Sequence, residues 1–229
     1  MKVNTSKTQL MVVSDALSFH PEATIADRNG QEMKSGPTMK VLGFHMSNRP
    51  TVAAHVEAIR KRFRQKYWVL FHLRRNGFSN EDLFKVYWNI IRPVADYCST
   101  VYHAMLTDEQ DEVLERCQAH ALRCILGKDV KYAKMREAAG VPTLRQRRVD
   151  LCDKFAQKCL KNARFAGWFL CKQAARSTRR TAGPPEYLEE FARCDRKKNS
   201  PVYYMRRQLN GKEGKEYGER YWDRTSTFD

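Results

Sequence analysis

One stretch, residues 78–105, constrains the fold more than any other because it is apolar around most of a helix. Its apolar residues recur at steps of three and four, the spacing that places side chains on one face of a helix. They are Leu83, Val86, Tyr87, Ile90, Ile91, Val94, Cys98, Val101 and Met105, and Phe84, Trp88, Ala95, Tyr97 and Tyr102 widen the stripe. A helix of this kind has to be buried on more than one side, so we expect helices before and after it.

The flanking segments supply those partners. Thr51 is a candidate N-cap, and apolar residues keep helical spacing behind it. Thr107 opens a capping-box sequence ahead of a third helix, which Gly127 is suited to end. Three helices joined by short connections predict a bundle over residues 49–127. The middle helix is expected to kink just before Pro93, because proline removes a backbone hydrogen bond.

Outside the bundle the chain divides into three parts. Two short apolar runs within residues 1–48, at Leu10–Val13 and Met39–Met46, predict a small antiparallel sheet. Helical spacing resumes in residues 128–175, whereas residues 176–229 are polar and basic and are expected to be a largely disordered tail. The predicted fold class is therefore mainly α with a small antiparallel β element at the N-terminus, an α+β arrangement.

The formal net charge of +16 predicts attraction to polyanions, of which nucleic acid is the commonest in cells. A membrane surface is the second candidate, but the sequence contains no long apolar run that would support it. A generally basic surface without a dedicated partner is the remaining alternative. We therefore expect RNA, DNA or an RNA–DNA hybrid as the partner, and neither a membrane nor a small-molecule substrate.

Two segments concentrate the positive charge. The first lies in the predicted helix 51–75, where no acidic residue follows Glu57. Its candidate contact residues are Arg60, Lys61, Arg64, Arg74 and Arg75. Solvated helix faces usually mix both signs of charge, so this run is a candidate polyanion-binding face, with an ordinary solvated face as the alternative. The second concentration begins at residue 144 and supplies three further candidates, Arg145, Arg147 and Arg148.

The cysteines argue against a metal centre and for a reducing environment. There are seven, an odd number, and no C-x-x-C pair occurs. The isolated Cys117-x-x-His120 lacks a second ligand pair at a suitable spacing, so no zinc site and no other cofactor is expected. Reduced thiols predict an intracellular location, the nucleus included. The sequence carries no signal of oligomeric state.

Five short motifs occur in an order that is similar to one known family. They are Asn4-x-x-Lys7-Thr8, Val41-Leu42-Gly43, Ile91-Arg92-Pro93-Val94-Ala95-Asp96-Tyr97, Leu114-Glu115-Arg116-Cys117-Gln118-Ala119-His120-Ala121-Leu122-Arg123, and Gly140-Val141-Pro142-Thr143-Leu144 with Arg147 and Arg148. In these motifs the chain resembles the C-terminal part of non-LTR (LINE-like) retrotransposon reverse transcriptases. The part concerned comprises the end of the palm, the thumb and the helical region beyond it.

The resemblance implies roles for several residues. Leu42, Gly43 and Phe44 match the family's primer grip, which holds the primer 3′ end; a glycine bulge in a hairpin is the alternative for Gly43. The basic face of helix 51–75 matches the thumb helix that follows the template–primer. Lys7 matches a motif D lysine that helps to protonate the leaving pyrophosphate, but without a metal site it is expected to be a plain surface lysine.

The sequence departs from the family in one respect that bears on chemistry. The family's polymerases hold two Mg²⁺ ions with palm carboxylates that include an Asp-Asp pair, and the sequence contains no Asp-Asp pair. Residues 1–48 are therefore expected to be a palm remnant and residues 49–127 a thumb-like bundle. No catalytic residue, no polymerase activity and no Mg²⁺ outside a full-length parent enzyme are expected. A helical protein-interaction module and a truncated retroelement product without function are the alternatives.

Overall fold

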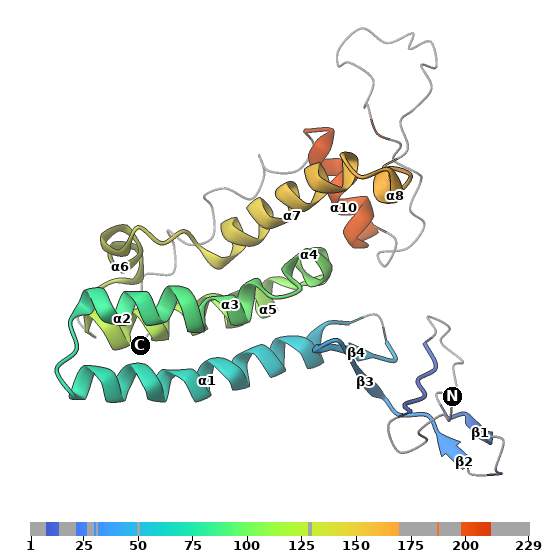
Figure 1. The fold of residues 1–229 in the computed structure, drawn as a ribbon, viewed down its shortest axis with the longest axis horizontal. Coiled ribbons are helices and arrows are strands. Elements are labelled where there is room, and N and C mark those ends of the chain that lie inside the picture. The colour runs from blue at the N-terminus through green and yellow to red at the C-terminus, as the bar shows by residue number, and fades with distance from the viewer. Residues whose placement is uncertain are drawn as a thin grey trace, which may run out of the picture. The chain divides into compact units, whose positions relative to one another are not determined.

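The chain forms two compact units, Met1–Arg62 and Phe63–Asp229, and the boundary falls within helix α1 (Ala53–Arg75). The computed structural model describes residues 8–13, 22–26, 30, 32–49, 51–127, 130–169, 187 and 198–211. The fold is mainly α-helical with a small antiparallel β element near the N-terminus, as the sequence predicts (Figure 1). The first half of α1 belongs to the first unit and its second half to the second.

Among the described residues of the first unit, the strands form two antiparallel pairs. The strands are β1 (Thr24–Ala26), β2 (Glu32–Lys34), β3 (Thr38–Val41) and β4 (Phe44–Ser47). β1 pairs with β2, and β3 pairs with β4. Leu10 adds an isolated parallel bridge to Ser35. The strands that the structure describes here are therefore short local pairings and not one continuous sheet.

The predicted pairing of Leu10–Val13 with Met39–Met46 is wrong, because the second run folds back on itself. Leu42 and Gly43 form its turn, with φ of 48° and 87°. Two successive positive φ values are typical of the tight turns whose twist matches that of a hairpin. Glycine adopts such a φ freely, whereas leucine rarely does. Because Leu42 is apolar, residues 39–46 have the sequence pattern of one continuous strand, and the turn could not be predicted from that pattern.

The apolar central segment is helical, and a π-helical turn stands where the kink was expected. α2 (Asn80–Val86) runs into this turn, Tyr87–Ile91, and then into α3 (Pro93–Asp96). The backbone N–H of Arg92 donates to Tyr87 O, five residues back, at 2.9 Å. Proline has no N–H to donate, and the wider turn before it keeps the helix continuous.

Cys98 makes a second interruption, which the sequence did not predict. Its backbone is left-handed, with φ of 56°. The chain beyond it forms α4 (Ser99–Tyr102) and a 3₁₀ turn, His103–Met105. The single kinked helix expected as far as Met105 is therefore wrong beyond Asp96. A cysteine in a left-handed conformation carries no local sequence signal, since this region favours glycine and asparagine.

α5 (Asp108–Leu126) begins and ends at the residues that the sequence marks, Thr107 and Gly127. It starts with the Thr107 capping box, in which Gln110 N donates to the Thr107 hydroxyl at 3.3 Å. The helices that follow are α6 (Tyr132–Ala139), α7 (Leu144–Leu160) and α8 (Ala163–Ala166). α6 ends at Gly140, whose φ of 59° is a left-handed C-terminal stop.

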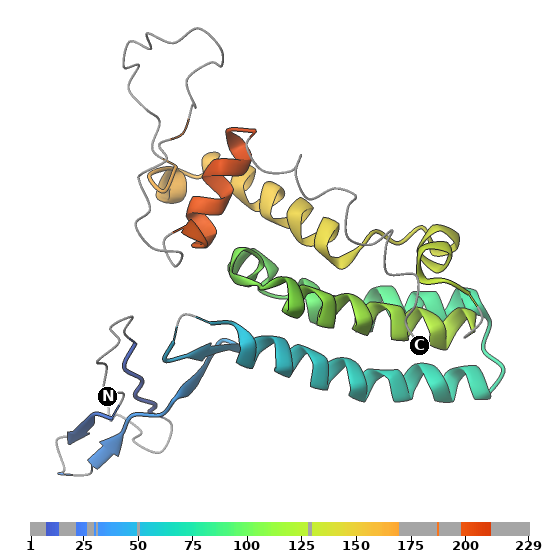
Figure 2. The same cartoon turned by 180° about the vertical axis from the view of Figure 1, so that it is seen from behind.

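Apolar side chains from these helices form the core of the second unit. Its fully buried members include Phe63, Leu70, Leu83, Tyr87, Ile91, Tyr102, Leu114, Leu122, Ile125 and Met135. The two opposite views show α2 beside α5, and α10 (Pro201–Leu209) beside α7 (Figures 1 and 2). The second half of α1, α2 with its continuation, and α5 each contribute to this core.

α10 lies in the segment for which a largely disordered tail was expected. Met205 of α10 is buried together with Ala156 and Cys159 of α7 and with Phe169. This packing stabilises a helix too short to persist alone in water. The tail expectation therefore does not hold at α10, and of the rest of residues 176–229 the structure describes only 187, 198–200, 210 and 211.

Candidate nucleic-acid interface

The second half of α1 has one face fixed against the bundle. Phe63 and Leu70 are fully buried. The hydroxyl of Tyr67 donates to the carbonyl of Cys117 on α5 at 2.8 Å, and its ring lies 4.9 Å from that of His120. Burial raises the pKa of Tyr67 far above its ordinary value, so it remains a neutral donor. These contacts fix which face of α1 is turned to solvent.

The solvent side carries two arginines and an aromatic cluster. Arg64, Trp68, Phe71 and Arg75 are exposed, and half-buried His72 lies beside them. At 3.6 residues per turn these five fall within about 100° of the helix circumference. We call this set the open face of α1. Among the described residues, neither Arg64 nor Arg75 forms an ion pair with a carboxylate.

Two further candidates of the same helix, Arg60 and Lys61, belong to the first unit. Arg60 Nε lies 2.8 Å from a carboxylate oxygen of Glu57, one turn earlier, so part of its charge is already offset. Lys61 is exposed. Of the two, Lys61 is therefore the better candidate for contact with a polyanion.

Arg74 has a structural role. Its Nη1 donates to the carbonyls of Cys124 and Arg123 at 2.9 and 3.5 Å. These carbonyls belong to the last turn of α5, where a helix presents unpaired acceptors and a partial negative charge. Arg74 therefore joins the ends of α1 and α5. No sequence pattern could have indicated this contact, because its partners lie some fifty residues away.

The primer-grip candidates lie in the β3–β4 hairpin of the first unit. Leu42 is 88% exposed at the turn, and Gly43 follows it there, so the bulge alternative is replaced by a hairpin turn. Phe44 is half-buried, with its ring 4.4 Å from that of His55. Phe44 therefore supports the hairpin, and Leu42 is the exposed member of the three. Lys7 lies outside the described residues.

The prediction that Arg148 contacts nucleic acid is wrong. It is 1% exposed, and its guanidinium pairs with buried Asp111 of α5. Arg145 Nη1 lies 3.4 Å from the other oxygen of the same carboxylate. In the described part of the chain, Nε and Nη1 of Arg148 have no hydrogen-bond partner, so the charge of Arg148 depends on Asp111. A buried guanidinium cannot reach a phosphate.

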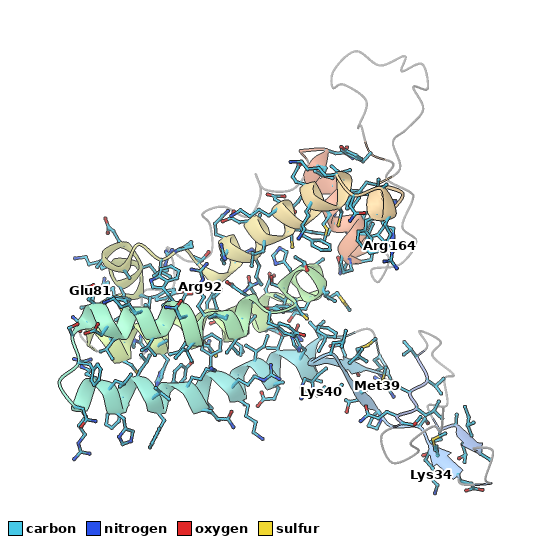
Figure 3. The ribbon with its side chains drawn as sticks, in the orientation of Figure 1. Lys34, Met39, Lys40, Glu81, Arg92 and Arg164 are labelled. Carbon is cyan, nitrogen blue, oxygen red and sulfur yellow. The ribbon has the colours of Figure 1, made fainter. Side chains whose placement is uncertain are left out.

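Arg147 is also engaged within the protein. Its Nε lies 3.3 Å from Oδ2 of Asp96, and Arg92 Nε lies 3.6 Å from the same oxygen. Arg92 is labelled in Figure 3, on the segment that α7 packs against. The carboxylate of Asp96 therefore pairs with two arginines, Arg92 from its own segment and Arg147 from α7. Arg147 has its charge largely offset before any ligand arrives.

Glu115 and Gln118 of α5 complete a buried polar network. Glu115 accepts hydrogen bonds from the Tyr132 hydroxyl at 2.7 Å and from the Arg145 backbone N–H at 2.9 Å. Burial raises the pKa of Glu115 above its ordinary value. Gln118 accepts from the Tyr87 hydroxyl at 2.8 Å and donates to the Pro142 carbonyl at 2.9 Å. The network joins the central segment, α5 and the start of α7.

This network explains what three of the five motifs do. Motif residues from the central segment, α5 and the α7 start contact one another: Asp96 with Arg147, and Gln118 with Pro142. Glu115 of the α5 motif also accepts from the backbone of Arg145, the residue after the motif's Leu144. These residues position helices. The signal that could have identified Arg148 as internal is its place at helical spacing between Leu144 and Cys152, both buried.

Two residues of the open face were missed as contact candidates. Trp68 and Phe71 are 65% and 56% exposed, and only the basic residues of this helix were taken as candidates. The signal was available, since Phe63, Tyr67 and Leu70 define the buried side and leave these two rings on the opposite side.

Comparison with protein-family models, curated proteins and solved structures finds no match. Within the described ranges, no group of three or more His, Cys, Asp or Glu side chains could hold a metal ion. Nor does any helix of that part of the chain have both the length and the apolarity needed to span a membrane.

Proposed function

We propose that this chain is a reverse-transcriptase-derived nucleic-acid-binding module, in which residues 49–127 act as a thumb and the open face of α1 contacts the backbone of RNA, DNA or their hybrid. The observation that carries the proposal is the pair Arg64 and Arg75, both exposed and without a carboxylate partner in the described residues. The order of the motifs supports the thumb assignment. The excess positive charge of the whole chain supports the polyanion.

The expected contacts are to phosphates. An arginine guanidinium offers a planar set of donors that matches a phosphate, and it stays charged at any physiological pH. Contacts of this kind orient a nucleic acid without reading its sequence. Arg64 and Arg75 would neutralise about two phosphates, which predicts a slope of about −2 for log affinity against log salt on a duplex.

The test is a salt titration with charge-reversal variants. Fluorescence anisotropy of a labelled RNA–DNA hybrid should give a dissociation constant that weakens steeply between about 50 and 200 mM salt. Arg64→Glu with Arg75→Glu should abolish most of the binding and flatten the slope. The matched control is Lys131→Glu with Lys134→Glu, which changes net charge equally at two exposed residues of the α6 region.

Circular dichroism of each variant checks that the helices remain. A salt-independent affinity, or an equal loss in the α6 control and the α1 variant, would contradict the proposal. An equal loss in the two variants would leave only non-specific attraction by net charge, which does not depend on which lysine or arginine is reversed. A salt-independent affinity would exclude phosphate contacts as the source of binding.

A further inference from the structure

The open face of α1 carries more exposed aromatic surface than phosphate contact requires. Trp68 is 65% exposed and Phe71 is 56% exposed. Large aromatic side chains gain most from burial, so two neighbouring exposed rings on one helix face suggest a surface that a partner covers. Both belong to the second unit, in which the opposite face of α1 is already packed.

The two exposed rings are joined by a third. The centroid of the His72 ring lies 3.9 Å from that of Trp68, with an interplanar angle of 51°. It lies 5.9 Å from that of Phe71, with the planes nearly perpendicular at 89°. His72 is half-buried and thus supports the two rings from beside the helix. The three rings form one continuous patch, which we call the aromatic patch.

Positive charge flanks the aromatic patch at both ends. Arg64 precedes Trp68 by four residues and Arg75 follows Phe71 by four, which is about 6 Å along the helix axis in each direction. The helix contains no acidic residue after Glu57. This charge pattern is complementary to a polyanion that also presents flat, apolar rings. An apolar protein segment would need neither flanking arginine.

We infer that the aromatic patch is a stacking platform for unpaired bases, so that the preferred ligand contains a single-stranded segment. This inference rests on the proposed function and names its ligand class. Bases in a duplex are already stacked and expose only their edges in the grooves, whereas an unpaired base offers its face to an aromatic side chain. With a base on Trp68 or Phe71, the adjoining phosphates face Arg64 and Arg75.

The experiment compares two ligands and two exposed tryptophans. The ligands are an unstructured single-stranded RNA oligonucleotide and a blunt RNA–DNA hybrid of equal length, each titrated by fluorescence anisotropy. Trp68→Ala should weaken single-strand binding about tenfold and change hybrid binding less than about twofold. Trp68→Phe should restore most of the lost affinity, because a smaller ring still stacks. The control is Trp168→Ala, which removes another exposed tryptophan, 44% exposed, away from α1.

The outcomes separate this inference from the proposed function. If Trp68→Ala weakens both ligands equally, or neither, the stacking platform is refuted. The arginine contacts then still stand, provided that Arg64→Glu with Arg75→Glu removes binding. If the charge reversal has no effect on either ligand, the proposed function itself fails. A change in sedimentation from dimer to monomer in Trp68→Ala would refute the inference in favour of a second copy of the chain covering the patch.

Discussion

Replacing Asp111 by alanine should destabilise the second unit by about 3–5 kcal/mol, because it leaves a buried positive charge without its partner. Arg148 is 1% exposed, and its guanidinium pairs with Asp111. Nε and Nη1 of Arg148 have no hydrogen-bond partner in the described residues. No second acceptor is therefore in place to replace the lost carboxylate of Asp111. A loss of this size is a third or more of the about 5–15 kcal/mol that typically holds a domain folded.

The free energy of unfolding can be measured by urea denaturation followed by far-ultraviolet circular dichroism. The matched control is Glu112→Ala on the same helix, which removes the exposed pair between Glu112 and Arg116 and should cost at most about 1 kcal/mol. Asp111→Leu combined with Arg148→Met should recover most of the stability, since an apolar pair of similar volume often replaces a buried ion pair without loss.

Two results would contradict the role given to the buried pair of Asp111 and Arg148. A cost for Asp111→Ala no larger than that for Glu112→Ala would mean that Arg148 finds water or another acceptor. A tenfold loss of nucleic-acid affinity in the stable Asp111→Leu/Arg148→Met variant would return Arg148 to the interface. The expected result is unchanged affinity, because Arg148 lies inside the protein.

Three further predictions concern stability. Burial and the nearby Arg148 lower the pKa of His103 to about 3, so the folded state keeps it neutral. The free energy of unfolding should therefore fall as pH drops from 6.5 toward that value, by about 2 kcal/mol between pH 7 and 5. In His103→Gln, urea denaturation should show a smaller fall over the same pH range. An equal fall in the variant and the unchanged protein would contradict this prediction. Met205→Ala should lower amide protection of α10 while leaving α5 unchanged, because it empties the contact with α7; hydrogen exchange that stays equal in α10 would count against it. Gly140→Ala should lower the stability by about 1 kcal/mol, measured by thermal unfolding. The φ of Gly140 is 59° and no atom lies within 4 Å of an added Cβ, so the cost comes from the left-handed backbone alone. An unchanged melting temperature would show that the turn relaxes.

Much of the helical framework could be predicted because its signals are local. Thr107 and Thr143 cap α5 and α7 where their sequence patterns indicate, and Gly140 ends α6. The breaks could not be predicted in the same way. Leu42 and Cys98 adopt left-handed backbones that their side chains disfavour, and the surrounding structure imposes these conformations.

For the candidate site, the sequence predicts which segments are basic but not which of their arginines are exposed. Local sequence shows where arginines gather, but whether one is exposed depends on partners distant in the chain. Arg148 pairs with Asp111 from 37 residues away, and Arg74 contacts the end of α5 from about 50 residues away. Arg64 and Arg75 had the same appearance in the sequence, yet they remain exposed. Pairing of this kind is a property of the tertiary fold.

Of the two basic segments, we expect the open face of α1 to contact nucleic acid and the start of α7 not to. Photo-cross-linking of the intact chain to an oligonucleotide containing 4-thiouridine, followed by mass spectrometry of the peptides, tests this directly. Cross-links are expected within residues 64–75, concentrated at Trp68 and Phe71. Cross-links concentrated within residues 144–148, with none on α1, would contradict it.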